Sequence, residues 1–134
     1  MRIVIDTNVL VSALINPAGA PARVVEEIRT QTLHPVVSRE LIAEYRDVLC
    51  RARFGFRSVQ VNALLDDLAV LALCLNARQI DSGGLPDPDD APFIAVALAA
   101  ACPIVTGNVR HFPSSSGVEV LTPAQCVARL HTGK

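Results

Sequence analysis

Four acidic residues stand at positions from which they could form one site. Asp6 follows directly after the apolar run at residues 2–5, and Glu44 lies in the apolar part of an expected helix, so its side chain should point inward. Asp87 and Asp90 stand in a stretch rich in glycine and proline, just before an alanine-rich helix. Carboxylates grouped in this way are suited to binding a cation, because their oxygens are hard ligands.

A cluster of carboxylates requires something to offset its own repulsion. Like charges about 4 Å apart repel by roughly 4 kcal/mol at an effective dielectric constant of 20. Mg²⁺ and Mn²⁺ suit such a cluster, since they prefer octahedral oxygen coordination and keep water in the remaining positions. That water can attack a phosphodiester in line while the ion neutralises the developing charge. The acids therefore favour metal-assisted hydrolysis.

Apolar runs alternate with amphipathic stretches along the chain. We expect strands at residues 2–5, 35–37, 103–106 and 118–121, and a further strand at about 73–80. We expect helices at residues 9–14, 21–30, 39–50, 59–75 and 91–101, and a last one that opens with the capping box Thr122-Pro123-Ala124-Gln125. This alternation predicts a parallel sheet covered on both faces, a doubly wound three-layer α/β/α sandwich.

The predicted sheet brings polar residues to one edge. Ligands of such sheets bind beyond the carboxyl ends of the strands. Asp6 follows the first strand, and Asn108 lies two residues past the strand that ends at Thr106. The simpler interpretation is that Asp6 and Asp90 only cap the helices that follow them, as Ser38 is expected to cap the helix at residues 39–50.

Length and composition restrict the class of protein. The 134 residues have room for one domain, which we place at residues 1–134. Hydrophobic residues make up 51% of the chain, yet no apolar run approaches the roughly 20 residues that span a bilayer. The opening residues do not resemble a signal peptide, so we expect a cytoplasmic protein without membrane contact.

Charge and cysteine content add two further expectations. With a net charge of −1, any binding of a polyanion should come from a local patch or from a bound cation. The four cysteines show no zinc-binding spacing, and we expect them to be reduced and to act as small core hydrophobes. They are Cys50, Cys74, Cys102 and Cys126.

Four short segments together carry a family resemblance. In order, they are Asp6-Thr7-Asn8, Ser38 to Glu44, Asp87 to Phe93, and Val105-Thr106-Gly107-Asn108. Their order and placement resemble the PIN-domain family, and the chain is similar almost from end to end to bacterial and archaeal PIN proteins, including the toxin halves of VapBC-type toxin-antitoxin pairs. The resemblance implies an Mg²⁺- or Mn²⁺-dependent ribonuclease, with RNA as substrate, a cognate antitoxin as a possible partner and a homodimer as its assembly.

The resemblance also implies roles for particular residues. Asp6, Glu44 and Asp90 match the catalytic, metal-binding acids, and Asp87 matches a further acid. Thr7, Asn8, Thr106 and Asn108 match residues that support the site. Asn108 stands where the family usually has a fourth acid, which leaves open whether one or two metal ions bind and whether Asp87 or Asp90 orients the water. A catalytically weak or inactive module that binds RNA or protein is the alternative function.

One basic segment is a candidate binding surface. Residues 51–57 contain Arg51, Arg53 and Arg57 together with two phenylalanines, and no acid. Such a segment could bind RNA phosphates and stack bases, or it could contact a partner protein. We assign no role to His34 or His111.

Overall fold

The computed structural model describes residues 1–76, 88–113 and 117–132. In this part of the chain, five parallel strands form one sheet in the order β3-β2-β1-β4-β5. The strands are β1 (Arg2–Ile5), β2 (His34–Val37), β3 (Leu73–Cys74), β4 (Ile104–Val105) and β5 (Val120–Leu121). Because β1 is central, the residue that follows it lies in the middle of the carboxyl edge of the sheet.

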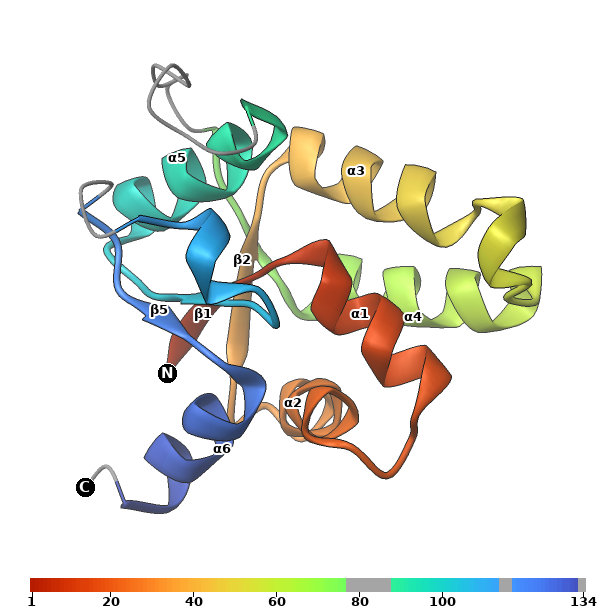
Figure 1. The fold of residues 1–134 in the computed structure, drawn as a ribbon, viewed down its shortest axis with the longest axis horizontal. Coiled ribbons are helices and arrows are strands. Elements are labelled where there is room, and N and C mark those ends of the chain that lie inside the picture. Colours follow the sequence, from red (N-terminus) through yellow and green to blue (C-terminus); the bar gives the residue numbers. More distant parts are fainter. Residues whose placement is uncertain (77–87, 114–116, 133–134) are drawn as a thin grey trace.

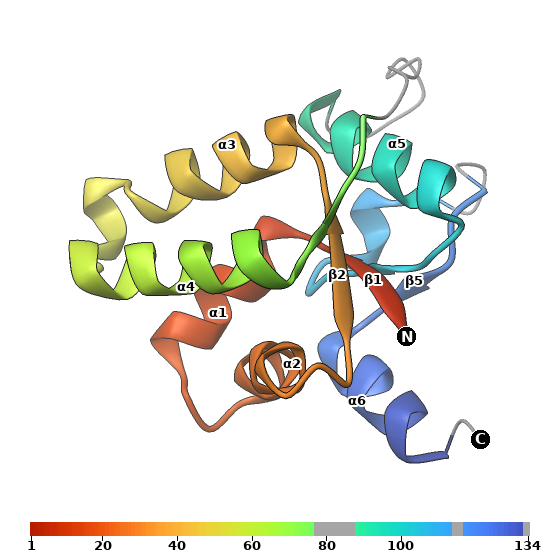
Figure 2. The same cartoon turned by 180° about the vertical axis from the view of Figure 1, so that it is seen from behind.

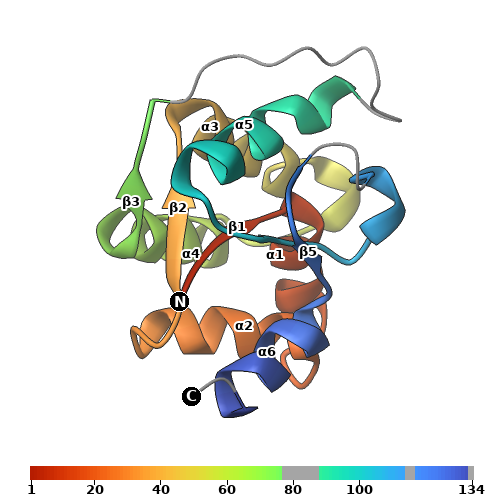
Figure 3. The same cartoon turned by 90° about the vertical axis from the view of Figure 1, so that its left-hand side faces the viewer.

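Helices cover the sheet on both faces. Figures 1, 2 and 3 show the sheet between α5 on one side and α1 and α4 on the other, while α2 and α6 lie near the amino ends of the strands. The predicted three-layer α/β/α sandwich is confirmed. The helices of the described residues are α1 (Thr7–Ile15), α2 (Ala20–Arg29), α3 (Arg39–Leu49), α4 (Ser58–Leu71), α5 (Ala91–Ala100) and α6 (Pro123–Thr132), with 3-10 turns η1 (Ala52–Phe54), η2 (Pro88–Asp90) and η3 (Val109–His111). None of the helices in these ranges has the length and apolar character that crossing a membrane requires.

The pairing of β1 with β4 determines which residue lies beside Asp6. Both faces of β1 are covered, and its continuous run of branched apolar residues is at most 1% exposed from Ile3 to Ile5. The register pairs Val4 with Ile104 and Ile5 with Val105. One further step in this register sets Asp6 beside Thr106.

Two predicted helix starts are confirmed in detail. Ser38 Oγ accepts a hydrogen bond of 3.2 Å from the backbone N–H of Leu41. At the start of α6, Thr122 and Gln125 form the predicted capping box, with bonds of 3.1 and 2.9 Å. Asp6 and Asp90 stand at the N-cap positions of α1 and α5, but neither side chain makes a capping hydrogen bond there. The N-cap hydrogen bond that Ser38 makes is therefore not repeated at Asp6 or Asp90.

Helix α4 is shorter than predicted. The helix expected at residues 59–75 ends at Leu71, because Leu73 and Cys74 pair in parallel with β2. The backbone N–H of Leu75 then donates to Val37 O at 2.8 Å, which extends this ladder. The strand expected at about 73–80 begins where it was predicted, whereas residues 77–80 and the loop at 81–87 lie outside the described residues.

The prediction that all four cysteines are core residues is wrong for two of them. All four are free thiols. Cys126 is fully buried, and burial raises the pKa of its thiol to about 11. Cys102 is half-buried, while Cys50, just past the end of α3, and Cys74, in the edge strand β3, are exposed. An edge strand and a helix end have fewer neighbours to cover them than the apolar sequence around them suggested.

Candidate active site

Asp6 lies at the carboxyl end of β1, in the middle of the sheet edge. It is 7% exposed, and its Oδ2 accepts a hydrogen bond of 2.7 Å from Thr106 Oγ1. Its backbone N–H donates to Val105 O at 2.9 Å. Both contacts follow from the pairing of β1 with β4, so this carboxylate is held in one orientation by the central strands.

The hydroxyl of Thr106 joins Asp6 to two asparagines. Thr106 is fully buried, and its Oγ1 accepts from the backbone N–H of Asn108 at 3.0 Å and from Asn8 Nδ2 at 3.4 Å. Asn8 Oδ1 accepts in turn from the backbone N–H of Gly107 at 3.1 Å. Three of the residues expected to support the site are thus one hydrogen-bonded group around Asp6.

Burial dominates the titration of Asp6. Desolvation raises the pKa of its carboxyl above the ordinary value, and this effect exceeds the lowering by the Thr106 hydroxyl, by the nearby backbone N–H groups of Thr7 and Asn8, and by the charge of His111. The hydrogen bonds and charges around the carboxylate therefore do not fully replace the stabilisation that water would give it. Carboxyl groups with raised pKa values are characteristic of functional sites.

Asp90 reaches the same edge from the start of α5. It is 8% exposed, and its Oδ2 lies 3.6 Å from Nδ1 of His111. The other ring nitrogen, Nε2, lies 3.0 Å from Asn108 Nδ2. Because an amide nitrogen donates, the neutral imidazole that fits this geometry carries its proton on Nδ1, toward Asp90. His111, to which the sequence analysis assigned no role, connects Asp90 through Asn108 to the group around Asp6.

Tyr45 holds α3 against the elements that carry the two carboxylates. Its buried hydroxyl donates a hydrogen bond of 2.6 Å to the backbone oxygen of Ile5, the residue before Asp6. Its ring centroid lies 6.2 Å from that of Phe93 in α5, three residues after Asp90. Burial raises the pKa of the Tyr45 hydroxyl, and the charge of Asp6 raises it further. This role of Tyr45 was not predicted, although a tyrosine in the apolar face of a helix needs a hydrogen-bond partner for its hydroxyl and so gave a signal.

The position of Glu44 depends on the contacts of its neighbour Tyr45. Glu44 precedes Tyr45 on α3 and is half-buried, as expected for a side chain directed partly inward. The other two acids of α3, Glu40 and Asp47, are exposed, and Asp47 pairs with Arg51 at 3.1 Å. Glu44 is therefore the more enclosed acid on α3.

The described acids do not form a complete metal site on their own. Within residues 1–76, 88–113 and 117–132, no three His, Cys, Asp or Glu side chains are grouped as they would be to hold a metal ion. Asp87 lies outside these residues. The metal-binding roles of the four acids accordingly stay predictions.

The donor chemistry at this edge nevertheless fits a hard divalent cation. Asp6 and Asp90 contribute buried carboxylates. Thr7 Oγ1 is also buried and has no hydrogen-bond partner among the described residues. Buried polar atoms nearly always have a partner, so an orphaned hydroxyl next to Asp6 is consistent with a place for a bound water or ion.

The basic segment at residues 51–57 lies away from this group of residues. It connects α3 to α4 at the end of the pair of helices (Figures 1 and 2). Arg51, Arg53 and Arg57 are all exposed. Their proposed binding of RNA or of a partner protein stays a prediction.

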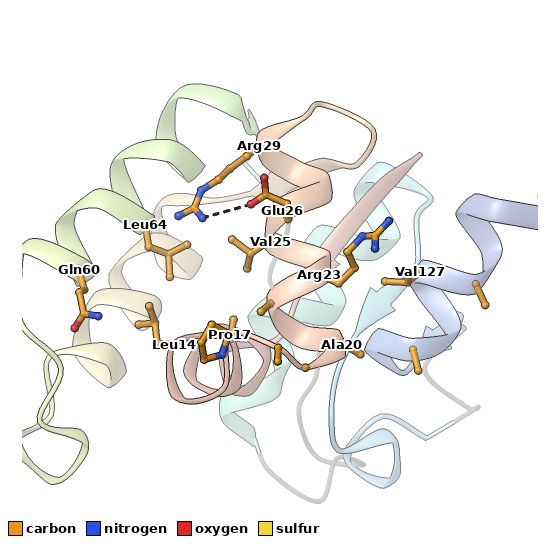
Figure 4. A pocket seen from close by; sticks show the side chains of 16 residues that line it. Leu14, Pro17, Ala20, Arg23, Val25, Glu26, Arg29, Gln60, Leu64 and Val127 are labelled. Carbon is orange, nitrogen blue, oxygen red and sulfur yellow. Dashed lines mark ion pairs between the residues drawn. The ribbon is translucent and has the colours of Figure 1, made fainter.

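A separate groove lies between α1, α2, α4 and α6 (Figure 4). Its volume is about 830 Å³, and its apolar lining includes Leu14, Val25, Leu64 and Val127. The two arginines of the groove are both paired: Arg23 with Glu27 at 3.0 Å, and Arg29 with Asp67 at 3.0 Å. The groove is thus largely apolar, with its cations neutralised, and it includes none of the acids discussed above.

Several solved structures share this fold. A chain of VapBC-1 from nontypeable Haemophilus influenzae matches with a TM-score of 0.61 and 17% identity, over 92% of this chain and 99% of that chain. A chain of FitAcB from Neisseria gonorrhoeae matches with a TM-score of 0.58 and 17% identity, over 91% and 98%. At this level of identity, the similarity supports the fold alone.

Sequence comparison gives the family. The uncharacterized protein MJ1680 of Methanocaldococcus jannaschii is 28% identical over 112 residues, which are 81% of this chain and 71% of that protein. The family model described as the PIN domain matches residues 2–110, from β1 into the turn η3. The match includes Asp6, Glu44, Asp90 and Asn108, and from it we conclude that this chain belongs to the PIN-domain family.

Proposed function

We propose that this protein is an Mg²⁺- or Mn²⁺-dependent endoribonuclease. PIN domains are generally nucleases that use divalent metal ions. The observation that carries the proposal is the pair of buried carboxylates, Asp6 and Asp90, linked through Thr106, Asn108 and His111 at the carboxyl edge of the sheet. Glu44 is the third acid of the proposed site and Asp87 the fourth.

The geometry suggests how the residues divide the work. A bound divalent ion would neutralise phosphate charge and favour ionisation of a water molecule. Asp6, held by Thr106, would bind the ion in a fixed orientation, and Glu44 would approach it from α3. Asp90 would accept the proton of the attacking water as the general base. Attack on phosphorus would then break the bond to the 3′ oxygen, which takes a proton from solvent water, so that a 5′-phosphate and a 3′-hydroxyl remain.

Asn108 favours a single ion in this proposal. Its side chain is neutral, and its Nδ2 faces the ring of His111 instead of the carboxylates. A second ion would thus have one anionic ligand fewer than the usual family pattern supplies. Activity that rises with metal concentration in one saturable step would support the arrangement.

Cleavage of a mixed single-stranded RNA pool tests the proposal. The wild type should cleave with Mg²⁺ or Mn²⁺ and lose activity with a chelator, and Asp6→Asn and Asp90→Asn should each lower the rate by at least a hundredfold. Asp66→Asn is the matched control, because Asp66 is an exposed carboxylate on α4, outside the site. Activity that survives in both site variants would remove these acids from the mechanism, and no cleavage by the wild type with either metal would favour the non-enzymatic module.

We further propose that an antitoxin regulates the protein by covering the groove of Figure 4. The apolar lining and the paired arginines suit a polypeptide with an apolar helix face better than they suit a polyanion. Coexpression with a small protein from the adjacent reading frame should yield a stable complex, and Val127→Glu should weaken it while leaving RNA cleavage unchanged. The homodimer stays a prediction, which light scattering of the purified protein would test.

A further inference from the structure

The connection between α3 and α4 forms an ordered stack of side chains. Gly55 has a φ of +63°, a left-handed conformation that side chains rarely adopt, and nothing lies within 4 Å of the place where a Cβ would stand. This turn brings Phe54 and Phe56 face to face, with ring centroids 5.4 Å apart and ring planes 9° from parallel. The guanidinium carbon of Arg53 lies 4.8 Å from the Phe54 centroid.

The stack leads from the core to the surface. Phe56 packs against the buried core and is half-buried, Phe54 stacks on Phe56, and the exposed Arg53 lies against Phe54. A long arginine side chain normally loses considerable conformational freedom when it binds a ligand. Here the aromatic contact already orders the guanidinium plane, so less freedom remains to be lost on binding.

The cations of this segment differ from those of the groove. Arg51 pairs with Asp47, but Arg53 and Arg57 form no ion pair within the described residues. The two phenylalanines are not among the large exposed hydrophobic residues, so the surface presents charge and a planar guanidinium instead of a bare apolar patch. Such a surface suits a flexible polyanion with planar bases better than it suits the apolar face of a protein.

We propose that Arg53, Phe54, Phe56 and Arg57, the arginine-phenylalanine tip, bind single-stranded RNA beyond the cleaved bond. This inference rests on the proposed ribonuclease function. Glu44 lies five residues before Leu49, the end of α3, which at 1.5 Å per residue is about 7.5 Å along the helix, and Arg53 follows four residues after Leu49. Since stacked nucleotides advance about 3.4 Å each, the tip contacts RNA more than about two nucleotides from the phosphate at the acidic site.

Binding measurements with a variant that cannot cleave test the tip directly. In an Asp6→Asn background, Arg53→Ser/Arg57→Ser should weaken binding of a single-stranded RNA 12-mer and lower the slope of log affinity against log salt by about 1.4, from roughly 0.7 for each lost phosphate contact. Phe54→Leu should weaken binding about twofold to fivefold, because it removes the contact that orders Arg53. The matched control is Arg23→Ser/Arg29→Ser, which removes the same charge from paired arginines on α2.

Cleavage of short and long substrates separates this inference from the proposed function. The Arg53→Ser/Arg57→Ser variant should cleave a trinucleotide at the wild-type rate and a 12-mer with a KM raised at least fivefold and an unchanged kcat. Wild-type cleavage with no difference between the variant and the control on the 12-mer would overturn the tip and leave the ribonuclease proposal intact. Tip-dependent RNA binding without any cleavage would uphold the tip as an RNA-binding surface and sink the ribonuclease. Unchanged RNA binding together with an altered oligomeric state would assign the tip to a protein contact and overturn the inference.

Discussion

Replacement of Thr106 by valine should expose how the central strands hold Asp6. Valine has nearly the shape of threonine but no hydroxyl. The substitution removes the 2.7 Å hydrogen bond to Asp6 and the acceptor for the backbone N–H of Asn108 and, at 3.4 Å, for Asn8 Nδ2. Because Thr106 is fully buried, water cannot replace the lost hydroxyl without disturbing the packing.

The magnitude follows from the two shorter of the three lost bonds, because the 3.4 Å contact is too long to contribute much. A hydrogen bond to a charged group contributes about 1.5–3 kcal/mol and one between neutral groups about 1 kcal/mol, so Thr106→Val should lower the free energy of unfolding by about 2.5–4 kcal/mol. In an Asp6→Asn background the first bond joins two neutral groups, so the same substitution should cost about 1 kcal/mol less. The difference is the coupling between the hydroxyl and the charge of Asp6.

Urea unfolding of the four proteins of this cycle, at pH 8 with chelator, measures both quantities. At about 4 °C per kcal/mol for a chain of this size, the single variant should also melt roughly 10 °C or more below the wild type. If Thr106→Val costs the same in both backgrounds, within about 0.3 kcal/mol, the hydroxyl does not act on the carboxylate, and Asp6 is not held through its charge by Thr106.

Three further predictions concern residues around the site. Tyr45→Phe should lower the free energy of unfolding by about 1–2 kcal/mol in urea, because the buried Ile5 carbonyl loses its donor, and should slow RNA cleavage by loosening α3. Ser38→Ala should cost about 1 kcal/mol, measured in the same way, through the lost cap of α3. Burial raises the folded-state pKa of Asp6 above 3.8, so the stability linked to its protonation is fully present below pH 3.8 and is lost as the pH rises through the folded pKa. The stability of the metal-free wild type relative to Asp6→Asn should therefore fall as the pH rises through that window, and a constant difference in urea unfolding would contradict it.

The parts of the fold that depend on local pattern could be predicted from the sequence. The bounds of β1 agree with the structure because its branched apolar run is needed for a strand buried on both faces. The caps at Ser38 and Thr122 depend on neighbours within three residues. The placement of Asp6 and Asn108 at one edge was predicted as well, since parallel strands end at a common edge.

The parts that depend on distant contacts could not be predicted. Tyr45 reaches a carbonyl 40 residues away in the sequence, and no local pattern identifies that acceptor. His111 acquires its place from the turn η3, which brings its ring to Asn108 and Asp90 together. The end of α4 was mispredicted for a similar reason, because pairing with β2 outweighs the helical pattern that continues past Leu71.

Most of the buried polar side chains of the described residues lie at the carboxyl edge of the sheet. Among the described residues, the buried polar or charged ones are Asp6, Thr7, Ser38, Asp90 and Thr106. Ser38 caps a helix, whereas the other four lie at the end of β1, the end of β4 and the start of α5, with the pKa of Asp6 raised and Thr7 Oγ1 without a partner in the described part of the chain.

Replacing all four together by apolar residues of similar size would remove the cost of burying two carboxylates, whereas replacing Thr106 alone leaves Asp6 without its donor. The polar group as a whole is therefore retained for a reason other than stability. A bound cation is such a reason, because it compensates the two carboxylates only in the folded state. Saturating Mn²⁺ at about 100 times its dissociation constant should then stabilise the wild type by about 2.7 kcal/mol, and should have much less effect on Asp6→Asn or Asp90→Asn. Equal stabilisation of all three proteins in thermal unfolding would mean that the ion binds elsewhere and that the burial of these carboxylates needs a different explanation.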